Sequence, residues 1–474
     1  MKRNQNIKLR VFGFLLMLLC MSFIQQNLHF INVVPLYGVV ESNNKPEFNF
    51  KDWFSGEYQR KYEANYEENA GFKNDLIKLY NQIDYTFFHE GHGVNVVVGE
   101  HDYLFQQDYI DEITGKKFIG KSSMEYKVRR LKAAQDYLQS QGKLFFTVLA
   151  PGKISFFKEY IPSWLLTQKN DTTNYSLFIR QSESAKLNVL DFKKWFLSMK
   201  DTSTIPLFPR QGIHWSYYGM ALAVDSIFNY ISSKGIGPLT DFSWSLEFPD
   251  NLRGTDYDIG DMLNLMWKLP YQKMAYPIFK YSEPKGVVRP RVMIIGDSFN
   301  WTPINADVFK NMFGNYEYYY YFKTIHRYDG TNPISVEESV LLDEIKKYDV
   351  VMILQSEANY NDIGFGFEEK LLNDLSGTGP YNSEIFAKVT SDPSFQILIK
   401  NIMDAKQFDQ VKAIAFLSDS LSKDKENVIV QILSDMRNNP EWIESIRKKA
   451  EENHIPLEEA MKNDAEWLYN RDHK

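Results

Sequence analysis

The sequence predicts an α/β fold in which a mainly parallel sheet carries helices on both faces. Strand-like and helix-like segments alternate from about Val94 to Gln355, and such alternation is typical of parallel strands joined by crossover helices. The 474 residues, 44% of them hydrophobic, also exceed what one typical core needs and suit two or three domains. We therefore expect a main α/β domain with an N-terminal apolar segment and a small helical extension at the C-terminus.

The N-terminal segment predicts export. A charge-free apolar run from Val11 to Ile24 follows four basic residues, Lys2, Arg3, Lys8 and Arg10, which is the order found in signal sequences. The run is shorter than the roughly 20 residues that a span needs, so residues 1–28 form either a cleaved signal peptide or, as we favour, a signal anchor. Residues 29–52 are then a polar stem, and the rest of the chain is periplasmic and held at the inner membrane.

The main domain, expected over residues 53–376, begins with helical patterns. Residues 53–88 show apolar positions at helical spacing, which predicts a buried face made of Leu76, Leu79, Ile83 and Phe87. The β-branched run 94–98 predicts a strand. A second helix has its apolar positions at 124, 128, 131, 134 and 138 and ends at Gly142, and the apolar run 144–149 after it predicts a buried strand.

The same alternation continues through the second half of the domain. Strands are expected at 188–192, 293–296, 316–325 and 350–355, and helices at 216–232 and 335–348. Ser335 and Glu338 have the spacing of a capping box at the start of the last helix. The stretch GTGPYN at 377–382 breaks the pattern, so we expect residues 377–474 to form a separate helical extension.

Composition excludes several kinds of function. The net charge is -7, and no basic block lies beyond the N-terminal tip, which argues against a nucleic-acid surface. The single cysteine, Cys20, lies in the apolar segment, so the rest of the chain has no disulfide, cysteine nucleophile or cysteine-bound zinc. His89 and His92 lack the spacing of a helical zinc site, and we expect no metal and no cofactor.

Two motifs indicate acyl-transfer chemistry. In PRVMIIGDSFN a buried strand ends at Gly296 and turns at Ser298, where a parallel sheet exposes its functional residues. In LFPRQGIHWSYYG, His214 comes just before Ser216, the expected N-cap of a helix. A serine and a histidine at two such positions suit a nucleophile and its general base.

These motifs resemble the AlgX/AlgJ-like alginate O-acetyltransferase family, a circularly rearranged, DHHW-type branch of the SGNH/GDSL hydrolase superfamily. The resemblance covers roughly residues 53–367 and includes the stretches VVVGEHDYLF, VLAPGKISFF, LFPRQGIHWS and IIGDSFN. It implies an SGNH-hydrolase-like fold with Ser298 as nucleophile and His214 as general base. It also implies a polysaccharide substrate and a membrane-bound O-acyltransferase partner that supplies acetyl groups.

One position departs from the family pattern. Where the pattern has an aspartate two residues before the histidine, this chain has Gly212, and loss of the orienting acid costs a serine protease about 10⁴ in kcat. The chain then has a Ser/His dyad, takes its acid from elsewhere, or has given up catalysis. Four carboxylates could supply the acid: Asp256, Asp258, Asp261 and Glu357.

Other residues are candidates for oxyanion or substrate contacts. The Ser298 N–H is expected to stabilise an oxyanion together with donors from neighbouring loops, among which are Gly296 and Asn359. Lys153 comes just after the predicted strand 144–149, and Arg210 comes four residues before His214. Both carry charges suited to an anionic sugar. Trp215, directly after His214, is expected to line the pocket.

The function expected from the sequence is O-acetyl transfer to an exported polysaccharide through an acyl-serine. An esterase or deacetylase would use the same residues with water as acceptor. A non-catalytic polysaccharide-binding component of the export machinery is the alternative that Gly212 suggests.

Overall fold

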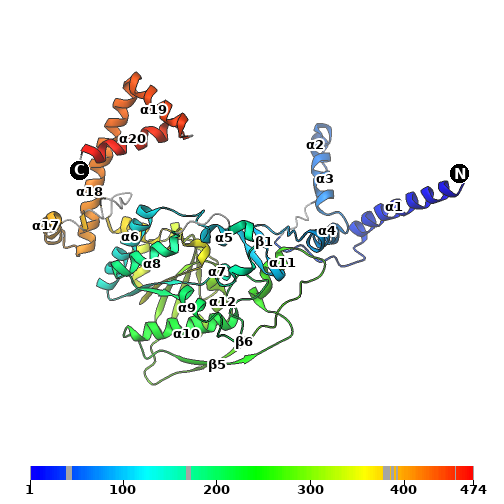
Figure 1. Cartoon of the computed structure of the whole chain (residues 1–474), viewed down its shortest axis with the longest axis horizontal. Coiled ribbons are helices and arrows are strands. Elements are labelled where there is room, and N and C mark those ends of the chain that lie inside the picture. The colour runs from blue at the N-terminus through cyan, green and yellow to red at the C-terminus, as the bar shows by residue number, and fades with distance from the viewer. Residues whose placement is uncertain are drawn as a thin grey trace.

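A seven-stranded sheet forms the centre of the protein (Figure 1). The computed structural model describes residues 2–38, 45–166, 172–376, 385, 389–390, 393–453 and 455–472. The predicted break at 377–382 lies outside these ranges. The strand order is β10-β9-β8-β7-β11-β3-β4, which places β7 and β11 in the middle of the sheet.

The inner strands are parallel, and most of their residues are buried. The strands are β3 (Leu144–Leu149), β4 (Val189–Asp191), β7 (Arg291–Gly296), β8 (Asn315–Tyr320), β9 (Thr324–Arg327), β10 (Ile334–Ser335) and β11 (Val350–Gln355). Pairs from β8 through β4 are parallel, whereas β9 and β10 add antiparallel strands at one edge. Near-continuous apolar runs such as VVMIL in β11 are typical of strands covered on both sides.

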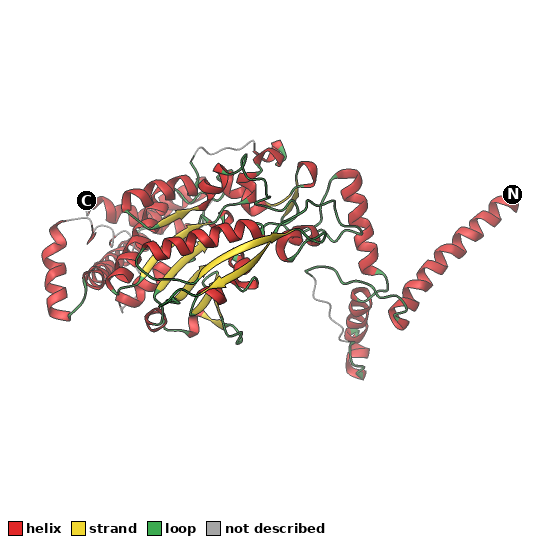
Figure 2. Ribbon diagram, turned by 90° about the horizontal axis from the view of Figure 1, so that it is seen from below, coloured by secondary structure: helices red, strands yellow, loops and turns green. Residues whose placement is uncertain are grey.

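Helices cover both faces of this sheet (Figure 2), which confirms the predicted fold class. One layer contains α6 (Lys121–Ser140), α8 (Asn174–Ala185), α14 (Leu341–Lys346) and α15 (Phe367–Ser376), packed on residues such as Met293 and Ile295. The other contains α9 (Phe192–Ser198), α10 (Tyr217–Ser233), α12 (Trp301–Asn305) and α13 (Val308–Met312), packed on Val292 and Ile294.

The helices α6 and α10 form as their patterns predict. The five apolar positions of α6 are all buried, and α10 buries Val224, Ile227, Phe228 and Ile231. Burying one such aliphatic side chain contributes roughly 1.5–3 kcal/mol, so these faces fix the helices on the sheet. The side chain of Ser216 caps α10 by accepting from Gly219 N at 2.9 Å.

The segment 316–348 differs from its prediction. The expected strand 316–325 is a hairpin, because Tyr321 and Phe322 adopt left-handed φ angles of 49° and 51° and reverse the chain between β8 and β9. The expected helix 335–348 is shorter and begins at Leu341. Ser335 instead caps a 3-10 turn at 336–338, where its hydroxyl accepts from Glu337 N, so the expected capping box does not form.

The N-terminal helices also differ from their prediction. Residues 53–88 contain parts of three helices, α2 (Phe50–Ser55), α3 (Glu57–Glu68) and α4 (Lys73–Phe88), separated at Gly56 and Phe72, which both have left-handed φ angles. The expected buried face of α4 is exposed, and its buried residues are Asn81 and Tyr85. Helix α1 spans Lys2–Leu28, and its part Ile7–Leu28 is long and apolar enough to cross a membrane, as a signal sequence also is.

The remaining elements lie outside the seven-stranded sheet. Two antiparallel pairs are β1 (Val96–Val98) with β2 (Leu104–Gln106) and β5 (Asp241–Glu247) with β6 (Tyr276–Ser282). The short helices are α5 (Gln107–Ile113), α7 (Lys153–Phe156) and α11 (Asp258–Met262). The C-terminal helices are α17 (Gln396–Lys406), α18 (Gln410–Asn438), α19 (Pro440–Glu452) and α20 (Leu457–Asp472).

Candidate active site

Ser298 lies directly after β7, at the carboxyl edge of the sheet. The strand ends at Gly296, where a Cβ would lie 1.9 Å from Leu354 O, so only glycine permits this approach of β7 to β11. The Gly296 carbonyl accepts from Tyr321 N at 2.8 Å. Gly296 thus has a packing role here, and it brings the partly exposed Ser298 to the open end of the strand.

The structure brings Ser298, His214 and Asp258 into one hydrogen-bonded chain. His214 Nε2 lies 2.9 Å from Ser298 Oγ, and His214 Nδ1 lies 2.8 Å from Asp258 Oδ2. Since the carboxylate can only accept, Nδ1 carries the proton, which leaves Nε2 free to accept from the serine hydroxyl. The arrangement is that of a nucleophile, a base and an orienting acid.

Asp258 is held in place by the backbone on both sides of the site. It is the first residue of α11, and its Oδ1 accepts from Ile259 N at 2.7 Å and from Ile213 N at 2.9 Å. The second of these bonds joins the acid to the residue just before His214. Because one carboxylate oxygen holds the loop and the other holds the imidazole, the two site segments are fixed relative to each other.

The other three candidate acids lie elsewhere. Asp256 is buried and accepts from Tyr276 Oη at 2.7 Å, and burial raises its pKa to about 7. Asp261 faces Lys268 at 3.5 Å on the surface. Glu357 is buried and pairs with Lys193 and Ser155. Of the four carboxylates weighed from the sequence, Asp258 alone contacts His214.

Gly212 has no room for the family's aspartate. A Cβ at this position would lie 2.4 Å from Thr255 O and 2.9 Å from the carbonyl carbon of Asp256. The backbone of the segment that leads into α11 therefore occupies the space of the missing side chain. The same segment carries Asp258 to His214, so the acid enters from a different loop.

Restoring the family residue is expected to harm this protein. In Gly212→Asp the new side chain must displace the 255–256 backbone, and we expect a loss of about 1–3 kcal/mol in the free energy of unfolding and no gain in activity. Gly212→Ala is the matched variant, because the clash begins at Cβ. Denaturant unfolding measures both, and an Asp variant as stable as the wild type would show that the 255–256 backbone leaves room for the side chain.

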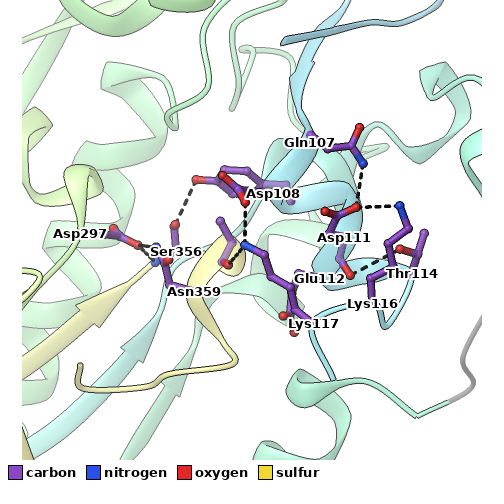
Figure 3. A network of polar contacts seen from close by, with 12 residues as sticks. Gln107, Asp108, Asp111, Glu112, Thr114, Lys116, Lys117, Asp297, Ser356 and Asn359 are labelled. Atoms are coloured by element: carbon purple, nitrogen blue, oxygen red, sulfur yellow. Dashed lines mark hydrogen bonds and ion pairs between the residues drawn. The ribbon is translucent and has the colours of Figure 1, made fainter. Parts of the chain in front are cut away.

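Asp297 joins the serine turn to the end of β11 (Figure 3). Its Oδ2 accepts from Ser356 N at 2.7 Å and from Asn359 Nδ2 at 2.8 Å, and its Oδ1 accepts from Phe299 N at 3.2 Å. From α5, Tyr109 donates to Ser356 Oγ at 3.0 Å. The Asn359 amide is thus engaged in holding Asp297, and its expected oxyanion contact stays a prediction. The sequence interpretation had given Asp297 no role.

Two expected substrate contacts are wrong because both side chains are fully buried. Trp215 packs against Phe299 at 5.3 Å between ring centroids, and the Phe299 ring lies 5.0 Å from that of His214, so the tryptophan supports the base from behind. Lys153 Nζ donates to Arg210 O at 3.1 Å and to Gly212 O at 2.5 Å. It therefore holds the loop that leads to His214.

Arg210 lies beside these residues and is partly exposed. Its guanidinium stacks on the ring of Tyr103 at 5.3 Å. A contact between Arg210 and an anionic sugar stays a prediction. Within the described part of the chain, no group of three or more histidine, cysteine or acidic residues is arranged to hold a metal ion.

The buried lysine gives the stability of the protein a pH dependence. Burial lowers the pKa of Lys153 to about 7, whereas an unfolded lysine has a pKa of about 10.4. Between these values the unfolded chain binds more protons, so the free energy of unfolding falls as the pH is lowered from about 10 to 7. We expect Lys153→Met to lack this contribution. Denaturant unfolding of both proteins across this range tests it, and parallel pH profiles would contradict it.

Part of the chain is similar to known proteins. Residues 96–267 match the family described as SGNH hydrolase-like domain, acetyltransferase AlgX. The matched range includes His214 and Asp258 and ends before Ser298. A Pseudomonas aeruginosa protein named "Probable alginate O-acetylase AlgJ" is 24% identical over 165 residues, or 35% of this chain and 40% of that relative. The alignment thus spans less than half of the relative's length.

Solved structures of AlgJ and AlgX are similar to part of this chain. The O-acetyltransferase domain of Pseudomonas putida AlgJ is 17% identical, with 56% of this chain and 92% of that chain covered and a TM-score of 0.39. Pseudomonas aeruginosa AlgX is 15% identical, with 60% of this chain and 69% of that chain covered and a TM-score of 0.38. The residue roles therefore rest on the geometry of this chain. Residues 96–267 are thus similar to the SGNH hydrolase-like acetyltransferase domain of AlgX, and part of the chain is similar to AlgJ.

Proposed function

We propose that this protein is an extracytoplasmic O-acetyltransferase that moves an acetyl group through an acyl-serine onto hydroxyls of an exported polysaccharide. The observation that carries the proposal is the hydrogen-bonded chain from Ser298 through His214 to Asp258. The acetyltransferase family of the domain supports the acyl group, and the name of the AlgJ relative supports a polysaccharide acceptor.

The first half of the reaction loads the serine. His214 Nε2 takes the proton of Ser298 Oγ as the oxygen attacks the acetyl carbonyl of the donor. The bond from that carbonyl to the donor's oxygen then breaks, and the departing oxygen receives the proton from His214. Asp258 stabilises the imidazolium that forms in between. The Ser298 N–H, at the start of the turn, is the donor that we assign to the oxyanion.

The second half transfers the acetyl group to a sugar. A sugar hydroxyl gives its proton to His214 Nε2 and attacks the acetyl-serine carbonyl, the bond to Ser298 Oγ breaks, and the proton returns to the serine. Beside the serine turn, the partly exposed rings of Trp301, Tyr320 and Tyr321 offer amphipathic surfaces for a sugar. A membrane-bound O-acyltransferase is the acetyl source that we propose.

The acceptor decides between transfer and hydrolysis. The purified full chain is incubated with a soluble acetyl ester and a deacetylated anionic polysaccharide, and acetyl groups on the polymer are measured beside free acetate. We expect ester-linked acetyl on the polymer, in amounts that rise with polymer concentration. Acetate release that polymer never diverts would instead indicate an esterase. Polymer binding without either product would indicate a non-catalytic binding protein.

A further inference from the structure

Helix α4 exposes an apolar face that the rest of the described structure does not cover. The side chains of this face recur at helical spacing and are exposed as follows: Leu76 60%, Leu79 40%, Tyr80 58%, Ile83 44% and Phe87 74%. A contiguous apolar surface of this kind on a soluble domain marks a contact with something else. We call these five residues the α4 apolar face.

The opposite side of α4 is attached to the main domain. Asn81 Nδ2 donates to Leu263 O at 3.0 Å, and Tyr85 Oη donates to Asp102 Oδ1 at 2.6 Å. Both side chains are buried. Because polar bonds fix this side, the helix cannot roll its apolar face inward without breaking them, so the exposure is a property of the fold.

The start of α4 is attached to the candidate membrane span. Ser22 Oγ donates to Gly71 O at 2.7 Å, and a Cβ on Gly71 would lie 2.2 Å from Ser22 O, so the two backbones are in close contact. The rings of Phe30 and Phe72 pack at 6.0 Å between centroids. Ser22 lies six residues before the end of α1 at Leu28, or about 9 Å along the helix. Helix α4 therefore begins level with a residue inside the span.

We propose that the α4 apolar face lies on the lipid bilayer, at the boundary between headgroups and acyl chains, and gives the protein a second membrane contact beside α1. Helix α4 lies beside the end of α1 (Figure 1). If Ile7–Leu28 crosses the membrane, the packing of Gly71 on Ser22 therefore holds the start of α4 at the boundary between headgroups and acyl chains. Aromatic and aliphatic side chains on one face of a helix are suited to that depth. Lipid is thus the occupant that the position of α1 favours over a second protein.

This contact also places the catalytic acid near the membrane. Leu263 and Asn264, which bind α4 through Asn81, directly follow α11, the helix that begins with Asp258. The stem contacts the same point, because Tyr37 N donates to Asn264 Oδ1 at 2.7 Å. An acetyl group supplied at the membrane would meet the serine site close to that surface. This consequence rests on the proposed function, whereas the lipid contact does not.

A fluorescent probe on the α4 apolar face tests the contact. The full chain carrying Cys20→Ser and Leu79→Cys is labelled with a polarity-sensitive dye and reconstituted in phosphatidylethanolamine/phosphatidylglycerol vesicles. The matched control places the dye at Glu183→Cys, an exposed position on α8 of the main domain. The dye is then exposed separately to aqueous iodide and to lipids that carry a quencher near the headgroup.

We expect the dye at position 79 to be quenched several-fold more by the lipid quencher than by iodide, and the dye at 183 to show the reverse. Quenching of position 79 by iodide would overturn the proposal, since the face would then be open to water. Shielding from both quenchers would also overturn it, since a protein would then cover the face. Ester hydrolysis by the same samples reports on the active site separately, so lipid quenching without hydrolysis would refute only the proposed function.

Discussion

Replacing Ser298 by alanine is expected to remove acetyl transfer and ester hydrolysis together. The hydroxyl oxygen carries the acetyl group in the proposed reaction, and it is the group that donates its proton to His214 Nε2. Removing the nucleophile of such a triad lowers kcat by roughly 10⁴–10⁶. Ser298 is partly exposed, and the one side-chain hydrogen bond described for it goes to His214. We therefore expect little change in the free energy of unfolding.

The rate of acetate release from a soluble acetyl ester measures this effect under saturating conditions. Ser243→Ala, at an exposed serine on β5, is the control and should leave the rate unchanged. Thermal unfolding verifies that both variants are folded. If Ser298→Ala kept a tenth or more of the wild-type rate, another residue would have to be the nucleophile.

The second large effect is expected for Asp258→Asn, with a fall of about 10⁴ in kcat. The amide keeps a similar shape, yet it loses the charge that stabilises the imidazolium, and its N–H₂ group can force the wrong histidine tautomer. Since the acid does not contact the acceptor in the proposed reaction, KM for the polysaccharide should change far less than kcat. Steady-state rates at varied acceptor concentration separate the two parameters.

Asp261→Asn is the matched control, because Asp261 lies on the same short helix and faces Lys268 at the surface. It should retain nearly full activity. Equal losses in both variants would indicate that the α11 loop is merely sensitive to substitution. A full rate in Asp258→Asn would mean that Ser298 and His214 act as a dyad.

Much of this fold follows from local patterns in the sequence. The apolar run of β11 and the single apolar stripes of α6 and α10 could be assigned because burial on two faces or on one face leaves a direct mark in the residue order. The hairpin at 320–324 left no such mark. It depends on two aromatic residues, Tyr321 and Phe322, in a left-handed conformation that residues of this type seldom adopt.

In the candidate site, too, some residues could be predicted from local sequence patterns and others could not. Ser298 and His214 each lie at the end of an element that the sequence reveals, so both could be named. The acid could only be narrowed to four carboxylates, because Asp258 comes 44 residues after His214 and reaches it through the folding of a loop. Gly212 was the useful signal, because the absence of the family's acid at that position made an acid from another loop one of three explanations.

Residues that support the site were harder to foresee. Lys153 and Trp215 carry side chains that commonly meet sugars, yet both are fully buried behind His214. The α4 apolar face was expected to be buried because its spacing is that of a core helix. The same spacing serves a helix that lies on a membrane, and the sequence alone does not distinguish the two.

The most direct test of the account is to isolate the acetylated enzyme. The full chain is mixed with an acetyl ester in the absence of polysaccharide, quenched after a short time in acid, digested and mapped by mass spectrometry. The account predicts one acetyl group on the peptide that contains Ser298, which disappears when polysaccharide is added before quenching and is recovered on the polymer. Transfer to the polymer with no acetyl on Ser298, or with acetyl on a different residue, would contradict it.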